Sequence, residues 1–167
     1  MNRPIAILLG SDSDFPFFRN GVKLLKKMGV PARIEVSSAH RTPRRTIELI
    51  KRFEKEGAMA IIAAAGGAAH LAGVAAAHTL LPVLGVPIPS PLMGVDSLLS
   101  MAQMPAGVPV AVFGIGEAGA TNSILFVLSL MARDNDGLRK KLARFRREQE
   151  RSVAEKNKRL QSTLKKK

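Results

Sequence analysis

Apolar and polar residues alternate in blocks along this 167-residue chain, and the blocks predict a strand followed by a helix five times over. Short and almost uniformly apolar runs are typical of strands that are buried on both faces of a sheet. Such strands are expected at residues 5–9, 59–65, 82–86 and 108–113, and the alternation of polar and apolar residues over 33–37 predicts a further strand. The regular alternation of strands and helices predicts a parallel sheet with helices on both faces.

Stretches with apolar residues three and four positions apart predict the helices. Thr42 and Pro43 are typical of a helix start, as cap and first helical residue, and Gly29 is typical of a helix end. The helices are expected at residues 13–28, 43–56, 68–80, 96–103, 118–133 and 135–163. The fold class is therefore α/β, a three-layer α/β/α sandwich that is flavodoxin- or Rossmann-like, plus a C-terminal helix. We expect one domain over residues 1–160, including that amphipathic helix, and a disordered basic tail over 161–167.

No charged residue occurs between Ala58 and Val95. A membrane span needs roughly 20 unbroken apolar residues, and glycines, histidines and four prolines interrupt this stretch. Helices at the surface of a small domain normally keep a polar face. Uncharged helices therefore indicate burial between subunits, and we expect a homo-oligomer and no membrane partner.

The net charge of +13 first suggests a nucleic-acid partner. Residues 138–167 hold 13 basic and 3 acidic side chains, whereas residues 1–137 hold 13 basic and 10 acidic ones. The excess is thus a property of the C-terminal helix, which we interpret as a solvated face. The chain has 7 Phe and no Trp, Tyr or Cys, which argues against base-stacking platforms, disulfides and thiolate metal sites. The first residues have no secretory-signal pattern, so a cytoplasmic location is expected.

In parallel α/β folds, ligands bind in the loops that follow the strands. The first such loop contains Ser11, Ser13 and Asp14 after Gly10. Hydroxyls and helix-start amides can hold an anion such as phosphate, and a carboxylate can accept hydrogen bonds from sugar hydroxyls. The alternative interpretation is helix capping by Ser13 or Asp14. The glycine and lysine spacings of a P-loop or a dinucleotide fingerprint are missing.

The second loop contains Ser38, Ala39, His40 and Arg41. The guanidinium of Arg41 can hold phosphate through two hydrogen bonds. A histidine can both give and take a proton near neutral pH, which makes His40 a candidate acid and base. The alternative for His40 is an ordinary surface histidine.

The third loop contains Gly66, Gly67, Ala68, His70 and Leu71. Small residues let the backbone lie flat against a planar ligand, and its amides could hold a carboxylate or CO2-like group. The alternative is close helix packing with His70 as an interior histidine. His78 lies eight residues after His70, about 12 Å away along a helix, so the two cannot share a metal. We expect no metal and interpret His78 as structural or interfacial.

Taken together, the three loops resemble the PurE family of purine-biosynthesis enzymes. The resemblance rests on Gly-Ser-Asp-Ser-Asp at 10–14, Ser-Ala-His-Arg-Thr-Pro at 38–43 and Ala-Gly-Gly-Ala-Ala-His-Leu at 65–71. A fourth match begins with Gly-Val-Asp-Ser-Leu at 94–98, and the whole covers about residues 4–155. The sequence departs from the family pattern at Ala72, Val74, Leu99 and residues 90–93, where we expect effects on a substrate lid and on rate.

The resemblance implies the class I branch, whose members rearrange N5-carboxyaminoimidazole ribonucleotide to 4-carboxyaminoimidazole ribonucleotide without a cofactor. It also implies an octamer with active sites between subunits. Ser11 and Arg41 would hold the phosphate, Asp14 the ribose hydroxyls, and His40 would shuttle the proton. Gly66, Gly67 and Ala68 would wall a CO2 pocket lined by His70. The remaining implied substrate-binding residues are Ser13, Ser38, Ala39 and Leu71.

Two alternatives remain at this point. One is direct carboxylation of aminoimidazole ribonucleotide with CO2, although that branch carries Gly-Arg-Ser-Asn in the third loop. The other is an RNA-binding protein built on a retired enzyme scaffold, with the basic C-terminal helix as its binding surface. We favour the enzyme without a nucleic-acid partner, because nothing in the three loops looks damaged.

Overall fold

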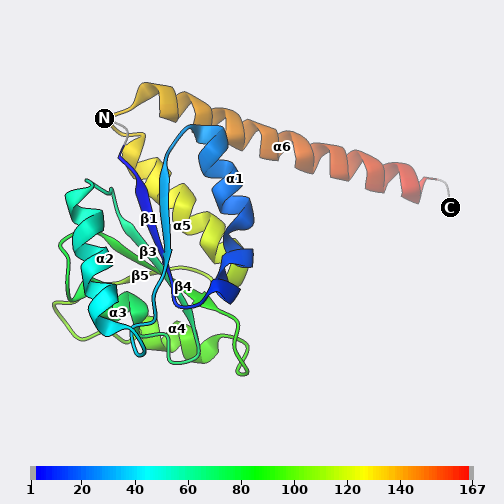
Figure 1. Cartoon of the computed structure of the whole chain (residues 1–167). Coiled ribbons are helices and arrows are strands. Elements are labelled where there is room, and N and C mark those ends of the chain that lie inside the picture. The colour runs from blue at the N-terminus through cyan, green and yellow to red at the C-terminus, as the bar shows by residue number, and fades with distance from the viewer. Residues whose placement is uncertain (1–2, 166–167) are drawn as a thin grey trace. The chain divides into compact units, whose positions relative to one another are not determined.

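The computed structural model describes residues 3–165 and confirms the predicted α/β fold (Figure 1). Its sheet is five-stranded and parallel, with the strand order β2-β1-β3-β4-β5. The strands are β1 (Ile5–Leu9), β2 (Ala32–Val36), β3 (Ile61–Gly66), β4 (Val83–Ile88) and β5 (Ala111–Val112). The chain moves outward from β1 to β2 and then returns to the other side of β1, so β1 and β3 flank the point where the winding reverses.

The helices lie between the strands and after the sheet. They are the 3-10 helix η1 (Asp12–Phe18), α1 (Arg19–Met28), α2 (Pro43–Lys55), α3 (Leu71–Ala76), α4 (Val95–Ala102), α5 (Gly116–Met131) and α6 (Asp136–Leu164). Contacts divide the chain into two compact units, Met1–Val127 and Leu128–Lys167, with the boundary inside α5. One domain over residues 1–160 stays a prediction. None of the helices in residues 3–165 is both long and apolar enough to span a membrane.

One face of the sheet is covered by α2, α3 and α4 (Figure 1). The side chains of Leu8 and Ile61 are completely buried there against Ile50 and Phe53 of α2 and Met101 of α4. On the other face α1 and α5 approach closely, because a Cβ at Gly21 would lie only 2.4 Å from the Ile124 side chain. The uniformly apolar strands are thus buried on both faces, as their composition predicted.

The predicted first helix is two elements in the structure. Pro16 lies inside η1 and has no amide proton, so the segment keeps 3-10 geometry until α1 begins at Arg19. The end of the helix is as predicted, because Gly29 adopts the left-handed conformation with φ of 75°.

The third helix is much shorter than the predicted range of 68–80. The hydroxyl of Thr79 and the amide of Leu80 both donate to the carboxylate of Glu54 in α2, which draws the chain out of the helix. His78 is exposed and donates from Nδ1 to the Val74 carbonyl at 2.8 Å. His70 and His78 therefore do not lie on one helix as the sequence suggested.

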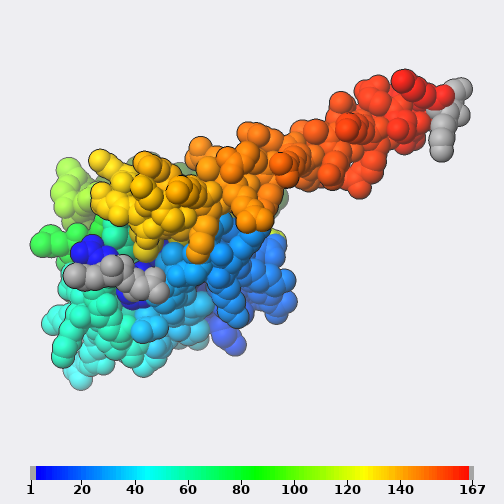
Figure 2. Space-filling view, turned by 90° about the horizontal axis from the view of Figure 1, so that it is seen from above, coloured from blue at the N-terminus to red at the C-terminus, as the bar shows by residue number. Residues whose placement is uncertain are grey.

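The second unit consists of the end of α5 and the 29-residue helix α6. The Asn135 side chain caps α6 by accepting a hydrogen bond from the Leu138 amide at 3.0 Å. In the space-filling view α6 is a rod one helix wide (Figure 2). Residues 161–164 are helical, where the sequence predicted a disordered tail, and residues 166–167 lie outside the described residues.

Candidate active site

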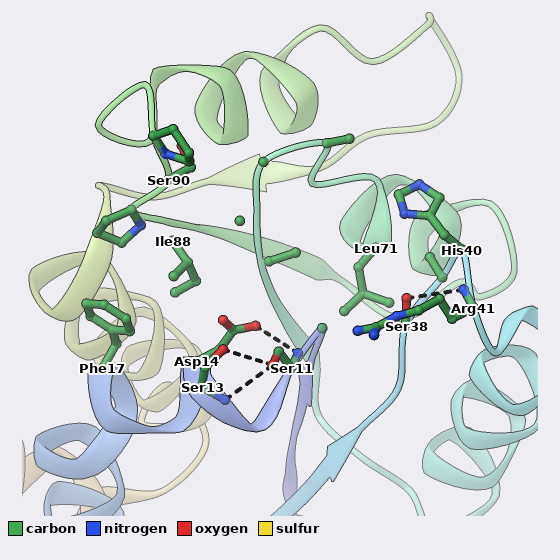
Figure 3. A pocket seen from close by; sticks show the side chains of 18 residues that line it. Ser11, Ser13, Asp14, Phe17, Ser38, His40, Arg41, Leu71, Ile88 and Ser90 are labelled. Carbon is green, nitrogen blue, oxygen red and sulfur yellow. Dashed lines mark hydrogen bonds between the residues drawn. The ribbon is translucent and has the colours of Figure 1, made fainter.

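A cavity of about 640 Å³ opens at the carboxyl edge of the sheet (Figure 3). Pockets that bind small molecules commonly have volumes of about 300–1,000 Å³. The loops that follow β1, β2, β3 and β4 all contribute to its lining. The lining residues are Gly10, Ser11, Ser13, Asp14, Phe17, Ser38, Ala39, His40, Arg41, Ala65, Gly66, Gly67, Ala68, Leu71, Ile88, Pro89, Ser90 and Pro91.

The register of the strands explains why these loops meet. Leu9 pairs with Val36 on one side and with Ala64 on the other, so β1 and β2 end at the same level and β3 ends two residues beyond it, at Gly66. Immediately afterwards the Gly10 amide donates to the Ala64 carbonyl at 2.8 Å, and the Ser37 amide donates to the Leu9 carbonyl at 2.8 Å. The cavity thus lies where the winding of the sheet reverses, the place at which doubly wound folds bind ligands.

The β1 loop is fixed by Ser11 and Asp14. The Ser11 side chain accepts from the Ser13 amide, and a carboxylate oxygen of Asp14 accepts from the Ser11 amide at 3.0 Å, which forms a capping box. The predicted alternative of capping in this loop is therefore present, but the cap is Ser11 rather than Ser13 or Asp14. Capping and ligand binding are compatible here, because all three side chains also line the cavity.

Asp14 is a buried carboxyl, with 5% of its surface exposed. Burial raises the pKa of Asp14 above its usual 3.8, and the nearby charge of Asp12 acts in the same direction, while amide hydrogen bonds from Ser11 and Gly10 oppose both. A Cβ at Gly10 would lie 3.5 Å from the Asp14 carboxylate and 3.3 Å from Ala65. Glycine at this position lets the carboxylate approach the end of β3.

The β2–α2 loop is held by three hydroxyl groups. The buried Ser37 hydroxyl lies 2.9 Å from the Thr46 hydroxyl and 3.0 Å from that of Thr42. Thr42 is the residue before α2, as predicted, but its side chain does not cap the helix. Its hydroxyl instead bonds to the backbone of Ser38, whose amide donates at 3.0 Å and whose carbonyl accepts at 3.0 Å. These bonds fix the loop that carries Ala39, His40 and Arg41.

Arg41 supplies the positive charge of the cavity. Its amide donates to the Ser38 hydroxyl at 3.2 Å, and its side chain extends past Ser38 toward the Ser11 side of the cavity (Figure 3). None of the ion pairs between residues 3 and 165 involves Arg41. The guanidinium is therefore available for an anionic ligand beside the hydroxyls of the β1 loop.

His40 and His70 are hydrogen-bonded to each other. Nε2 of His40 lies 2.9 Å from Nδ1 of His70, and the two rings are nearly perpendicular, with an angle of 82° between their planes. One of these nitrogens must carry the shared proton while the other accepts it, so the pair carries at most one positive charge while the bond persists. His70 is exposed rather than interior, contrary to the structural alternative considered from sequence, and it adjoins the cavity through His40.

The β3–α3 loop forms the small-residue wall that its composition predicted. Gly66, Gly67, Ala68 and Leu71 all line the cavity, and Gly67 has a left-handed backbone with φ of 65°. A side chain at Gly67 would strain this conformation. The loop therefore leaves its backbone close to any ligand in this part of the cavity.

Sequence reasoning associated residues 90–93 with a substrate lid but named no residue that follows the fourth strand among the binding residues. Ile88 and Ser90 line the cavity, and the Ser90 hydroxyl donates to Asp96 while it accepts from the Gly94 amide at 3.1 Å. The hydrogen bond from Ser90 lowers the pKa of Asp96, which lies in the first turn of α4; the N-cap of this helix is Gly94. The position of this loop after a predicted strand was the signal that could have placed it in the site.

Phe17 was also missed. It lies within the predicted first helix and was assigned no role from the sequence, yet it is only partly buried and lines the cavity. Within residues 3–165 no cluster of three or more His, Cys, Asp or Glu side chains is arranged to hold a metal ion. The site therefore combines an anion-binding end, a buried carboxylate and a histidine pair.

Comparison with known sequences gives a consistent result. The family model described as AIR carboxylase matches residues 4–152. An N5-carboxyaminoimidazole ribonucleotide mutase of Pyrococcus horikoshii is 46% identical over 158 residues, which cover 94% of this chain and 88% of that protein. The protein of the same name from Escherichia coli K12 is 44% identical over 90% of each chain.

Solved structures agree on the fold. The crystal structure of Treponema denticola PurE superimposes with a TM-score of 0.83 at 23% sequence identity, over 95% of this chain and 99% of the other. At this identity the likeness concerns the path of the chain, and it covers both the sheet and the helices around it.

Proposed function

The chain belongs to the AIR carboxylase family, and we propose that it converts N5-carboxyaminoimidazole ribonucleotide to 4-carboxyaminoimidazole ribonucleotide in purine biosynthesis. The observation that carries this proposal is the cavity in which a free guanidinium, a buried carboxylate and a histidine pair meet. These groups match the three parts of the substrate, which are a phosphate, a ribose and a carboxylated base.

The ligand would lie along the cavity with its phosphate near Arg41 and the Ser11, Ser13 and Ser38 hydroxyls. A guanidinium paired with phosphate makes strong, charge-assisted hydrogen bonds. Asp14 would accept hydrogen bonds from the ribose hydroxyls. The base would then extend toward His40, between Ala39 and the wall formed by Gly66, Gly67, Ala68 and Leu71.

The reaction needs two proton transfers. In the first step the bond between the carbamate nitrogen and its carboxyl carbon breaks, CO2 leaves, and His40 donates a proton to that nitrogen. In the second step carbon 4 of the ring forms a bond to the trapped CO2, and His40 removes the proton from carbon 4. The histidine ends in its starting protonation state, so no other acid, base or cofactor is needed.

The hydrogen bond between His40 and His70 suits this cycle. His40 must act first as a proton donor and then as a proton acceptor. His70 can accept a hydrogen bond from Nε2 of His40 or donate one to it, so the pair can stay bonded in both protonation states of His40. His70 would thereby hold the His40 ring in position at the base end of the cavity. The small residues of the β3–α3 loop would keep CO2 close to carbon 4.

We further propose that the active form is a cytoplasmic homo-oligomer, an octamer by the PurE resemblance, that binds no nucleic acid. Exposed apolar side chains support self-association. They include Leu80, Leu92 and Met93, which lie in the stretch without charged residues between Ala58 and Val95. Light scattering of the purified protein would measure the subunit number. A monomer at micromolar concentration would contradict this part of the proposal.

The test of function is an assay with each candidate substrate. The wild type should consume N5-carboxyaminoimidazole ribonucleotide without ATP, and His40→Asn should lower kcat by about 10²–10⁴-fold. His78→Asn is the matched control and should retain activity, because His78 is exposed and does not line the cavity. Turnover of aminoimidazole ribonucleotide with bicarbonate, but not of the carbamate, would refute the proposal in favour of direct carboxylation.

A further inference from the structure

Three side chains of the β1 loop and η1 follow each other at intervals of three residues. A 3-10 helix has three residues per turn, so side chains at i and i+3 lie directly above one another. Asp14 and Phe17 of η1 therefore form one row, which Ser11 precedes as the N-cap of η1, and all three line the cavity. Together they present a hydroxyl, then a carboxylate, then an aromatic ring.

The ring of Phe17 is supported from behind. A Cβ placed on Gly116 would lie 3.6 Å from Cδ1 and 3.7 Å from Cε1 of Phe17, and 3.6 Å from Cγ of Pro89. Gly116 is buried and has a left-handed backbone with φ of 73°, so the ring packs against bare backbone at that point. Phe17 is only partly buried in spite of this support, which leaves part of the ring open to the cavity.

Phe17 and His40 lie at opposite sides of the cavity, with Asp14 next to Phe17 (Figure 3). Ile88 and Pro89 continue the apolar surface beside the ring. A ligand group at this side meets a carboxylate and an apolar wall together. Such a pair complements a sugar, which has hydroxyl edges and an apolar C–H face.

We propose that Phe17 is a specificity-determining residue that packs against the C–H face of the substrate ribose while Asp14 accepts hydrogen bonds from its hydroxyls. The identity of the sugar rests on the proposed ribonucleotide substrate. The ring also excludes water from the Asp14 carboxylate, and hydrogen bonds to a charged group are stronger where water is excluded. Phe17 does not touch the reacting atoms, which lie at the His40 side.

The experiment compares Phe17→Ala with Phe15→Ala, a control of the same residue type in the same 3-10 helix. Phe15 is 38% exposed, lies outside the row and does not line the cavity. Binding of ribose 5-phosphate and of inorganic phosphate is measured by titration, and kcat and KM are measured with the carbamate substrate. Phe17→Ala should weaken ribose 5-phosphate about tenfold and raise KM by a similar factor with kcat unchanged, as expected for the loss of apolar contact area.

Inorganic phosphate should bind both variants as it binds the wild type, and Phe15→Ala should change none of these values. Equal weakening of inorganic phosphate in Phe17→Ala would mean a collapsed cavity and would overturn the inference. Unchanged affinity for ribose 5-phosphate, or a fall in kcat instead of a rise in KM, would overturn it too. A wild type that binds ribose 5-phosphate but does not turn over the carbamate would refute the proposed function and leave the binding comparison interpretable.

Discussion

Replacing Ser37 by alanine should loosen the loop that carries His40 and Arg41. Ser37 is 3% exposed, and its hydroxyl is within hydrogen-bond distance of the Thr46 and Thr42 hydroxyls. Thr46 donates its only hydroxyl proton to the Thr42 carbonyl at 3.2 Å, so Ser37 is the donor to Thr46. Thr42 likewise donates its only hydroxyl proton, to the Ser38 carbonyl at 3.0 Å, so neither threonine donates to Ser37. Ser37→Ala therefore removes one hydrogen bond, the one that Ser37 donates.

The expected loss of stability follows from this bond. A buried hydrogen bond contributes roughly 0.5–1.5 kcal/mol net, so its loss should lower the free energy of unfolding by about 1 kcal/mol. Thr46 keeps its bond to the Thr42 carbonyl, and no buried donor is left without an acceptor. For a chain of this size, about 1 kcal/mol corresponds to a fall of roughly 2–4 °C in the thermal midpoint.

Urea denaturation, thermal melting and the mutase assay together test this reasoning, with Ser123→Ala as a matched control. Ser123 is completely buried and its hydroxyl donates to the Ala120 carbonyl within α5 at 2.9 Å. Alanine is the better helix former at this position, which offsets the lost bond, so Ser123→Ala should cost less than about 0.5 kcal/mol. Ser37→Ala should also lower kcat/KM and speed amide hydrogen exchange in the loop. A change below about 0.5 kcal/mol, or an equal effect of Ser123→Ala, would refute the role assigned to the hydroxyl cluster.

Burial raises the pKa of Asp14 above 3.8, so stability from this group is present at low pH and is lost as pH rises through its native pKa. The free energy of unfolding of Asp14→Asn minus that of the wild type should therefore grow from pH 3.8 upward and then level off. Urea titrations in which this difference stays constant or shrinks with pH would contradict the reasoning. Gly119→Ala should destabilise by about 3 kcal/mol or more in thermal melts, because its Cβ would lie 1.5 Å from the Gly114 carbonyl oxygen; a soluble variant with an unchanged midpoint would disprove the clash. His70→Leu should lower kcat, by less than the about 10²–10⁴-fold expected of His40→Asn, with little change in KM in steady-state kinetics; a purely KM effect would show that His70 does not position His40.

The parts of the fold that local composition controls were predictable. The strand from Ile5 to Leu9 and the left-handed helix end at Gly29 were found at the predicted residues. The predicted strand over residues 108–113 is too long, since β5 has only two residues. An apolar run does not reveal which backbone amides find a hydrogen-bond partner. Pairing depends on the neighbouring strand, and β5 meets only Leu84 and Gly85 of β4.

The candidate site was predictable to the extent that it follows the strand ends. Parallel strands bring their following loops to one edge, so Asp14, His40 and Gly67 could be grouped without a structure. The orientation of single side chains could not be predicted from the sequence. The placement of Phe17 in the cavity depends on the 3-10 geometry around Pro16, and the bond between His40 and His70 depends on two loops that are 30 residues apart.

The sheet ends in two different strands, and this affects how the protein can aggregate. An open edge strand can template another chain through its unpaired backbone groups. At one edge, β2 carries Glu35, which is ion-paired to Arg45 and Arg52, and Arg33, which is paired to Glu56 at 2.8 Å. At the other edge, β5 is two residues long and closely follows Pro109. Neither border offers a long apolar strand for continuation, so the sheet is poorly suited to fibril growth, and copies of the chain should associate through helices and loops.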